Sequence, residues 1–311
     1  MRARPIPIIA AVVLSAMALA GCGSSSSTAS PSGSSKGNVI IGAADFTEIE
    51  LMAQMYSELL QAKGFTTTIK TVTNRELYEP ALENGQIDVV PDYAATMAEF
   101  LNTKVNGPNA APVATSDATT TAAALNKLAN PLGLTALTPA QAVDQNAFVV
   151  SQAFATQHNL KTLSDLAALK MPITLAAVEE CLTRKFCGGV LKDNYGMSIK
   201  EVLPTGFDTL PTKKAVQDGT AQLGLVGSTD ATLSDFNLVI LTDDKKVQLA
   251  DNLTPIVGKK YANDADLTSA LNSLSATLTT ADLVTMIRDV DTQRELPADV
   301  AKTYLTSKGL I

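Results

Sequence analysis

The sequence predicts an α/β fold made of two lobes, and three observations support that prediction. Short apolar segments alternate with stretches of helical periodicity over residues 39–90, and the alternation returns over residues 164–241. Residues 81–90 and 215–226 echo each other as a helix, a glycine that ends it and a buried strand. The chain from about Asn38 onward is long enough for two cores. The alternation implies parallel strands joined by crossover helices.

The first lobe is expected to alternate strands and helices. The Thr47-x-x-Glu50 spacing is that of a capping box at a helix start, and Gly64 and Gly85 end helices. The expected elements are a strand at 39–42, a helix from the capping box to Gly64, a strand at 66–72, a helix at 76–83 and a strand at 87–90. The Thr- and Ala-rich residues 110–124 should be a loose connection that leads into a helix.

The second half repeats this order and then ends in helices. Its expected elements are a helix from Ser164-Asp165, strands at 173–178, 223–226 and 238–241, a helix at 213–218, and C-terminal helices at 266–277, from a Thr279-x-x-Asp282 cap, and after Pro297. In open α/β sheets ligands bind outside the carboxyl ends of the strands. Two such lobes that face each other therefore predict a ligand cleft between them.

The first 21 residues have the features of a cleaved secretory signal. Arg2 and Arg4 give a positive start, and the apolar run at residues 8–19 is too short to span a membrane. The Leu19-Ala-Gly-Cys22 stretch resembles the bacterial lipobox, in which the cysteine is acylated and becomes the new N-terminus. This resemblance predicts a lipid anchor at Cys22 on the outer face of the plasma membrane. An ordinary signal peptide followed by a chance cysteine is the alternative.

The rest of the chain should consist of a tether and an acidic globular part. Residues 22–37 are rich in serine and have almost no apolar surface to bury, which favours a flexible linker. The whole chain carries 24 Lys and Arg against 31 Asp and Glu, a net charge of −7. That balance argues against a nucleic-acid partner. No stretch after residue 21 has the sequence of a transmembrane helix.

Motifs of the common enzyme classes are absent from the sequence. It has a single histidine, His158, and no G-x-S-x-G, H-E-x-x-H, P-loop or G-x-G-x-x-G pattern. We therefore expect no enzymatic activity, no cofactor and no metal. A secreted enzyme and an adhesive lipoprotein are the alternatives of other classes, and an assay of ligand-induced closure alongside a turnover assay separates them from a binding protein.

Two cysteines are left once Cys22 is assigned to the anchor. Cys181 and Cys187 lie six positions apart, and an even pair in an exported protein predicts a local disulfide. A zinc site is the alternative. It is disfavoured because His158 is the only histidine and no further cysteine can complete the ligand set.

Three stretches of the sequence carry a family resemblance. They are residues 42–48 (GAADFTE), residues 80–96 (PALENGQIDVVPDYAAT), and residues 228–230 (STD) followed by 241–245 (LTDDK). Their order and spacing resemble the glycine betaine/choline-type binding proteins of ABC importers. The resemblance runs from residue 39 to the C-terminus and implies a type II periplasmic-binding-protein fold that closes on a small solute by a hinge. It also implies a monomer that delivers the solute to an ABC permease.

The same resemblance implies where the lobes divide. Residues 38–145 plus 251–311 should form a discontinuous lobe 1, and residues 146–250 should form lobe 2. The two segments that cross between the lobes are expected at residues 143–150 and 241–251.

A ligand site follows from the resemblance as well. A trimethylammonium group cannot donate hydrogen bonds, so the family surrounds it with aromatic faces and fixes a ligand carboxylate with Arg or backbone N–H groups. Tyr93 matches a cage tyrosine buried between the lobes, Thr96 a neighbouring polar contact and Arg184 a carboxylate-binding arginine. The other residues expected at the site are Asp45, Phe46, Thr47, Asp144, Asn146, Ser228, Thr229, Asp230 and Asp251.

Structural roles compete with ligand binding at five of these positions. Tyr93 can be a core or surface tyrosine instead of a cage residue. Asp45 and Thr47 lie at a strand-to-helix turn, and Asp230 lies in a polar loop, so all three can act as capping residues. Arg184 lies between the two cysteines and can be a solvated loop cation.

The sequence departs from the family at the aromatic cage. The positions of the other cage tyrosines hold Asn146, Gly227 and Asp251. Because a desolvated cation–π contact contributes about 2 kcal/mol, we expect weak binding of glycine betaine, better binding of a neutral hydroxylated or aromatic solute, and choline between them. The alternative is that phenylalanines take the place of the tyrosines, namely Phe46, Phe148 or Phe207.

We predict that the mature protein is lipidated at Cys22. The native protein should partition into detergent, and Cys22→Ala should release or misprocess it, because acyl chains supply the membrane affinity at about 0.8 kcal/mol per buried CH₂. Mass spectrometry of the native N-terminal peptide is the measurement, and an unmodified Cys22 would contradict the prediction.

Overall fold

The computed structural model describes residues 36–115, 117–249 and 251–311. The predictions for the signal and for Cys22 concern residues outside these ranges. Within the ranges, no helix combines the length and the apolar character that crossing a membrane requires.

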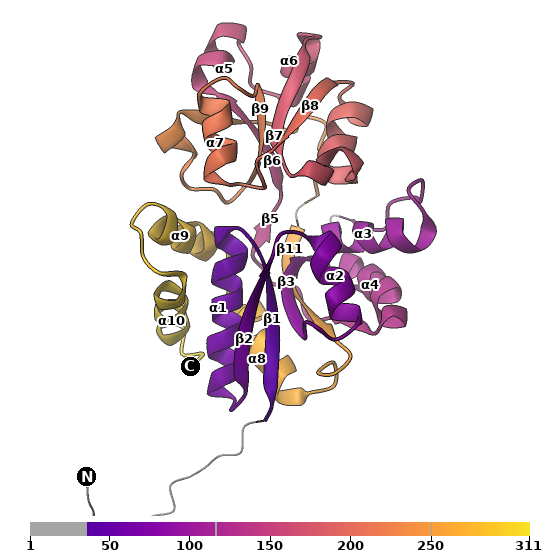
Figure 1. Ribbon diagram of the computed structural model, residues 1–311, viewed down its shortest axis with the longest axis vertical. Helices are drawn as coiled ribbons and strands as arrows, with labels where there is room; N and C mark the ends of the chain where they lie inside the picture. The colour runs from indigo at the N-terminus through magenta and orange to yellow at the C-terminus, as the bar shows by residue number, and fades with distance from the viewer. Residues whose placement is uncertain (1–35, 116, 250) are drawn as a thin grey trace, which may run out of the picture. The chain divides into compact units, whose positions relative to one another are not determined.

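Lobe 1, as we name it here, is built on a six-stranded sheet with the order β2-β1-β3-β11-β4, in which β5 also pairs with β11 (Figure 1). β1 pairs in parallel with β2 and β3, as the crossover pattern predicts, whereas β11 runs antiparallel to β3 and β4. The strands are β1 (Asn38–Ala44), β2 (Thr66–Val72), β3 (Val89–Tyr93), β4 (Leu134–Ala136), β5 (Val143–Asp144) and β11 (Asp251–Gly258).

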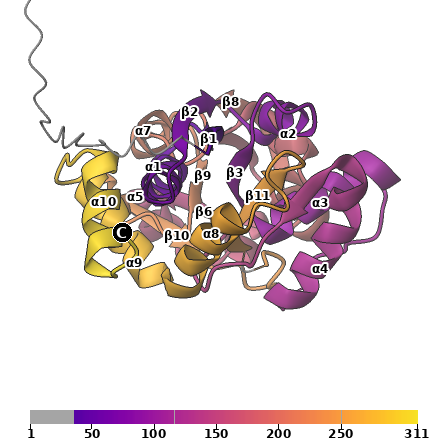
Figure 2. The same ribbon diagram turned by 90° about the horizontal axis from the view of Figure 1, so that it is seen from below.

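Helices cover both faces of this sheet (Figure 2). One apolar cluster joins the sheet to α1 (Thr47–Ala62), α8 (Ala265–Thr277), α9 (Thr280–Asp291) and α10 (Pro297–Ser307). A second cluster joins it to α2 (Arg75–Glu83), α3 (Ala94–Asn106) and α4 (Ala118–Ala129), which a short 3₁₀ turn follows at η1 (Asn130–Leu132). Because both faces are buried, β1 and β3 are apolar along most of their length.

Lobe 2 contains a five-stranded sheet with the order β10-β6-β9-β7-β8. β7 is parallel to β8 and β9, and β6 is antiparallel to β9 and β10. Its elements are β6 (Asn146–Ser151), α5 (Gln152–His158), α6 (Leu163–Ala168), β7 (Pro172–Ala177), the 3₁₀ helix η2 (Glu179–Thr183), the π-helix η3 (Lys185–Asn194), β8 (Ser198–Pro204), α7 (Leu210–Gln217), β9 (Leu223–Gly227), η4 (Leu233–Phe236) and β10 (Leu238–Leu241). The chain enters this lobe between β5 and β6 and leaves it between β10 and β11.

Most of the predicted elements are confirmed, and two bounds are corrected. The strands at 66–72 and 238–241 have the predicted limits. The strand predicted at 87–90 lies at 89–93 instead, because residues up to Tyr93 pair with β11. The helix predicted at 213–218 begins three residues earlier, at Leu210, because the Thr209 hydroxyl accepts a hydrogen bond from the Thr212 N–H and caps it.

The capping box predicted at Thr47-x-x-Glu50 is wrong. The N-cap of α1 is Phe46, whose side chain makes no capping bond, and Thr47 is already the first helical residue. Its hydroxyl instead donates to Asp291 Oδ1 at 2.7 Å. The Thr47 side chain therefore bonds to the end of α9 and does not cap α1. The Thr279-x-x-Asp282 box, in contrast, forms as predicted at the start of α9.

The structure joins Cys181 and Cys187 in a disulfide within the core of lobe 2. Both residues are buried, between η2 and η3, beside Phe186 and Val190. The bridge closes the short turn that presents Arg184.

We predict that reduction of this disulfide lowers the melting temperature without unfolding the protein at room temperature. A short closed loop contributes on the order of 2 kcal/mol, which corresponds to roughly 4–8 °C for a domain of this size. Calorimetry with and without reductant measures the shift. Two reactive thiols per mature chain in the denatured, non-reduced protein would contradict the bridge.

Candidate functional site

A cleft with a volume of about 780 Å³ lies between the lobes, and its lining comes from both of them. Lobe 1 contributes the loop after β1, the start of α2, the end of β3 and the first turns of α3. Lobe 2 contributes the turn between β7 and η3 and the loop after β8. These loops follow strand carboxyl ends, which is where the sequence predicts the ligand cleft.

Glu48 is a functional candidate that the sequence analysis missed, although it ends the GAADFTE stretch. It lies in the first turn of α1 and is buried. Its Oε1 accepts a hydrogen bond from the Tyr93 hydroxyl at 2.5 Å, and its Oε2 accepts one from the Thr229 hydroxyl at 2.7 Å. Burial, reinforced by the nearby charge of Asp144, raises the pKa of Glu48 to about 8. Because Thr229 belongs to lobe 2, this carboxyl joins the two lobes.

Asp144 lies beside Glu48 at the point where the chain enters lobe 2. Its Oδ1 accepts hydrogen bonds from the Ser228 hydroxyl at 2.7 Å and from the Thr229 N–H at 3.2 Å, and burial raises its pKa. A side chain at Gly227 would place its Cβ 2.8 Å from Asp144 Oδ2. Glycine is therefore required here for the backbone to approach the carboxylate.

Asp251 caps helix α3 from the floor of the cleft. Its Oδ1 accepts from the Ala95 N–H at 2.5 Å and its Oδ2 from the Thr96 N–H at 2.9 Å. Burial nevertheless raises the pKa of Asp251 to about 7. The Thr96 hydroxyl in turn accepts from Arg75 Nη2 at 2.8 Å, and Arg75 is paired with Asp92. The predicted site residues Thr96 and Asp251 are thus brought together, in a hydrogen-bond network that also includes the backbone of α3.

Aromatic rings from both lobes meet across the cleft. Phe46 of lobe 1 and Phe207 of lobe 2 have ring centroids 5.0 Å apart at an interplanar angle of 70°. Both line the cleft together with Tyr93. Phe148, in contrast, is 1% exposed in the core of lobe 2, so it cannot replace a cage tyrosine. Further aromatic side chains in the lining are Tyr78, Phe100 and Phe186.

Arg184 lines the cleft but is already paired. Its Nε and Nη2 donate to Oε1 and Oε2 of Glu76 at 3.1 and 2.6 Å, and Nη2 also donates to Glu180 Oε1 at 2.7 Å. Glu76 stands in the first turn of α2 in lobe 1, so this pair spans the cleft. The alternative of a solvated loop cation does not describe this arginine.

The remaining predicted residues divide between the cleft and structural positions. Asp45 and Asn146 line the cleft, and Asn146 Nδ2 donates to the Phe186 carbonyl at 2.9 Å. Asp230 lines neither the cleft nor the small cavity beside it. It pairs with Lys213 at 2.8 Å and accepts from the Thr232 hydroxyl, which fits its alternative role as a structural residue.

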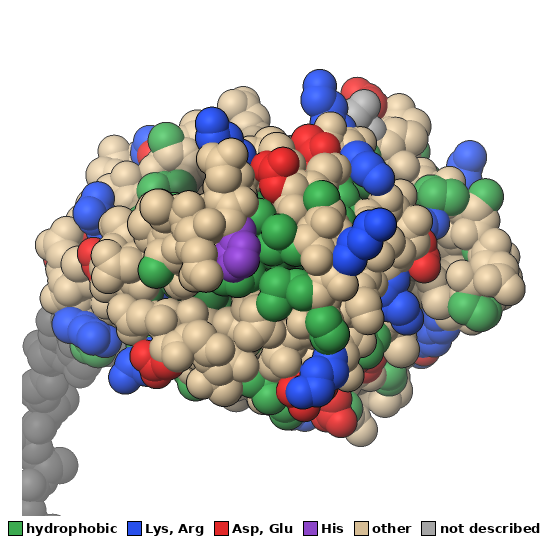
Figure 3. Space-filling view, turned by 90° about the horizontal axis from the view of Figure 1, so that it is seen from above, with side chains coloured by type: hydrophobic (Ala, Val, Ile, Leu, Met, Phe, Trp, Pro, Cys, Tyr) green, Lys and Arg blue, Asp and Glu red, His purple; other side chains and the backbone are tan. Residues whose placement is uncertain are grey.

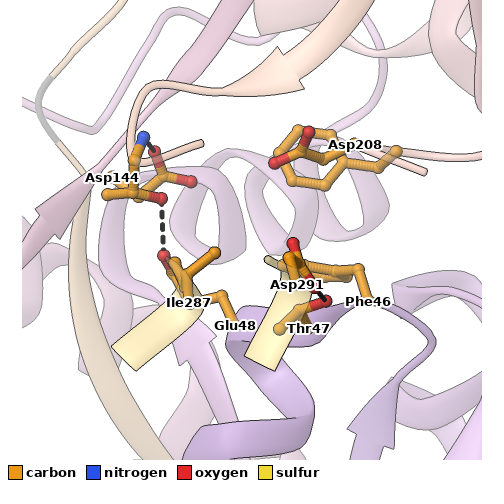
Figure 4. Close-up of a pocket in the computed structure, with 9 residues that line it drawn as sticks. Phe46, Thr47, Glu48, Asp144, Asp208, Ile287 and Asp291 are labelled. Atoms are coloured by element: carbon orange, nitrogen blue, oxygen red, sulfur yellow. Dashed lines mark hydrogen bonds between the residues drawn. The ribbon is translucent and has the colours of Figure 1, made fainter. Parts of the chain in front are cut away.

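A second, much smaller cavity has a volume of about 10 Å³ (Figure 4). Four carboxyl groups reach its wall, with Phe46 and Thr47 of lobe 1 and Phe207 of lobe 2. These carboxyl groups belong to Glu48, Asp144, Asp208 and Asp291. Among the described residues, no group of three or more His, Cys, Asp or Glu side chains is arranged to hold a metal ion. His158 is exposed at the end of α5 and lines neither cavity (Figure 3).

Comparison with known proteins assigns the chain to a family. The family model described as the substrate binding domain of the ABC-type glycine betaine transport system matches residues 37–307. The chain belongs to this family. It is 24% identical to a glycine-betaine-binding protein of Pseudomonas aeruginosa, over 87% of this chain and 88% of that protein. It is 23% identical to a carnitine transport binding protein of Listeria monocytogenes, over 88% and 87%.

Solved structures show the same two-lobed fold. A crystal structure of a glycine betaine/carnitine/choline ABC transporter protein matches with a TM-score of 0.63 and 20% identity, over 88% of this chain and 99% of that one. A choline binding protein in complex with choline matches with a TM-score of 0.62 and 15% identity, over 88% and 89%. The predicted fold class, two α/β lobes with a ligand cleft, and the predicted family are confirmed.

We predict that Glu48→Gln flattens the pH dependence of stability. Because burial raises the pKa of Glu48 from 4.5 to about 8, the folded protein binds the extra proton between these values and loses stability as the pH rises through them. The variant lacks this loss. Its free energy of unfolding should therefore increase relative to that of wild type by up to about 1.4 kcal/mol for each pH unit as the pH rises. Urea unfolding at pH 5 to 8 measures the difference.

The matched control is Glu58→Gln, the same substitution on the same helix at a residue that is not buried. A Glu48→Gln curve that runs parallel to wild type would contradict the role given to the Glu48 carboxyl.

Proposed function

We propose that this chain is the extracytoplasmic solute-binding component of an ABC importer and that it captures a small organic cation in the cleft between its lobes. Closure of the lobes delivers the solute to a membrane permease. The observation that carries the proposal is the cleft itself, in which aromatic rings from both lobes stand beside an excess of carboxyl groups. The family assignment supports solute binding as the activity.

The proposal includes export and anchoring. The signal at residues 1–21, the acylated Cys22 and the tether at 22–37 would hold the binding domain at the outer face of the plasma membrane. The domain would act as a monomer. Residues 38–145 plus 251–311 would move as lobe 1 against residues 146–250 as lobe 2, with hinges where the chain crosses between the two sheets.

The charge of the cleft favours a cation. Its lining holds seven acidic side chains against four basic ones, and Asp251 stays partly charged near neutral pH because its pKa is about 7. The acidic residues are Asp45, Glu76, Glu99, Asp144, Glu179, Glu180 and Asp251. A cation that enters this cleft offsets the repulsion among them, whereas an anion adds to it. The faces of Phe46, Phe207 and Tyr93 supply cation–π attraction at the same place.

This argument changes the ligand order that the sequence favours. Three positions that hold cage tyrosines in the family hold Asn146, Gly227 and Asp251 in this chain. From the sequence alone, this loss of aromatic faces favours a neutral solute. Phe46 and Phe207 reach the cleft, however, and restore part of the aromatic lining. We therefore place an organic cation such as choline first and keep glycine betaine last, because its carboxylate would meet the carboxyl groups of the cleft.

A neutral hydroxylated or aromatic solute is the second candidate. Asn74 Oδ1 is a buried acceptor with no hydrogen-bond partner, and Asn74 lines the cleft. A ligand hydroxyl would satisfy it, and a buried acceptor left unpaired costs about 1–3 kcal/mol. Tyr93 and Phe46 would stack on a ring of such a ligand.

The cleft offers no arrangement that supports catalysis as the first function. His158 is outside the cleft, and the carboxyl groups of Asp251 and Glu180 are engaged, Asp251 with the backbone of α3 and Glu180 with Arg184. We therefore propose binding without turnover. Incubation of the protein with its best ligand, followed by recovery of unchanged ligand, tests this point.

We predict that choline binds at least about tenfold more tightly than glycine betaine, with a neutral polyol such as inositol or an aromatic diol such as catechol between them. Isothermal titration calorimetry of the soluble domain, starting after the tether, measures all of them under one buffer. Phe207→Ala should weaken choline by about tenfold, because one aromatic face is lost.

Phe148→Ala is unsuitable as the control because it opens the core. Phe154→Ala serves instead, because Phe154 lies on α5, is only partly buried and lines neither cavity, and it should change choline affinity little. Micromolar or tighter binding of glycine betaine would overturn the ligand order. Binding of the polyol or diol alone would move the second candidate to first place.

A further inference from the structure

Among the described residues, three side-chain pairs link lobe 1 to lobe 2 across the cleft, apart from the bonds of Asp144 to Ser228 and Thr229 beside the crossing chain. One is the buried bond of Glu48 to Thr229, and one is the longer ion pair of Glu99 with Lys185 at 3.8 Å. The third is the pair of Glu76 with Arg184, which has two nearly parallel N–H···O bonds. This last geometry is the one that a guanidinium makes with a free carboxylate ligand.

The environment of Glu76 favours the ionised form of its carboxyl group. Burial would raise its pKa, but the hydrogen bonds and charge of Arg184, with the charge of Arg75, outweigh burial and lower it. Glu76 also lies in the first turn of α2, where the helix dipole favours a negative charge. Its side chain is 35% exposed and that of Arg184 is 27% exposed, so both remain accessible from the cleft.

We propose that Glu76 is a specificity-determining residue that occupies Arg184 as an internal carboxylate and thereby excludes solutes that carry one. The inference rests on the proposed function and deepens it by explaining why the cleft takes a cation rather than a zwitterion. Glu180, on the same lobe as Arg184, accepts a further hydrogen bond from Nη2 at 2.7 Å. A ligand carboxylate could take the bidentate Nε–Nη2 edge of Arg184 only by displacing Glu76.

No other basic side chain of the cleft lining offers a free partner among the described residues. Lys104 is paired with Glu79 and Glu83, and Lys185 with Glu99. Arg75 is committed to Asp92 and Thr96. Removal of the Glu76 carboxylate therefore makes Arg184 the one cleft cation with reduced pairing, and leaves the aromatic lining in place.

The test is a change of specificity in Glu76→Gln. Calorimetry compares glycine betaine and choline on wild type and on the variant. We expect the variant to bind glycine betaine about tenfold more tightly than wild type, since a charge-assisted pair with Arg184 becomes available. Choline affinity should not rise and should fall by up to about threefold, because the variant loses one of the seven acidic side chains of the lining. Glu76→Ala should give the same gain, which separates loss of the carboxylate from an effect of the new amide.

The charge-matched control is Glu179→Gln. Glu179 also lines the cleft, and it makes no ion pair with Arg184 among the contacts of the described residues. It should not increase glycine betaine affinity. An equal gain in this control would show a general charge effect and overturn the proposal. The gain should also vanish in Glu76→Gln combined with Arg184→Gln, and its persistence there would overturn the proposal too.

The outcomes separate this inference from the proposed function. If wild type binds choline but the Glu76 variants do not bind glycine betaine more tightly, the role of Glu76 is wrong and the proposed function is retained. A gain for glycine betaine in a protein whose wild type ignores choline would support Glu76 and sink the ligand class. Failure of wild type and variants to bind either compound would overturn both.

Discussion

The arrangement of the cleft depends on one buried carboxyl group, that of Glu48, which both lobes satisfy. Tyr93 of lobe 1 and Thr229 of lobe 2 each donate to one of its oxygens. A buried carboxyl without partners costs several kcal/mol, so the two lobes cannot separate at this point without exposing it to water or leaving it unsatisfied. Asp144 next to it holds Ser228 and the Thr229 backbone, which fixes the strand end that carries the crossing chain. The bonds of Glu48 thus set how the aromatic rings above it meet.

Acid replaces aromatic surface in this cleft, and the two act on a cation in different ways. A tyrosine face attracts a quaternary ammonium with little desolvation cost, whereas a carboxylate attracts it more strongly and loses more hydration on closure. The structure keeps the cost low by giving Asp251 and Asp144 backbone and hydroxyl donors before a ligand arrives. Phe46 and Phe207 come from opposite lobes, and their rings contact each other at an interplanar angle of 70°. Because neither lobe alone holds the complete site, the function proposed above would couple ligand affinity to closure of the lobes.

The sequence predicts what is encoded locally and misses what long-range pairs decide. The Thr279-x-x-Asp282 box is readable because both partners lie within one helical turn, and it forms. Thr47 shows the same local signal, but Asp291 captures its hydroxyl from a helix far along the chain. Glu48 ends the GAADFTE stretch, but nothing in the sequence pairs Glu48 or Glu76 with lobe 2, because their partners there are 181 and 108 residues away. The family resemblance predicted Tyr93 and Arg184 as site residues. Only the structure shows that Glu76 pairs with Arg184.

The two kinds of contact across the cleft have different consequences for motion. The Glu48–Thr229 bond is buried and neutral at physiological pH, since the pKa of Glu48 is about 8, so its strength hardly depends on salt. The Glu76–Arg184 pair is about one third exposed and contributes no more than roughly 1 kcal/mol to closure. A pair of that strength can open and re-form in the hinge motion that we propose. While it is formed, Glu76 occupies the Nε–Nη2 edge of Arg184, so a ligand carboxylate gains that edge only by giving up the existing pair.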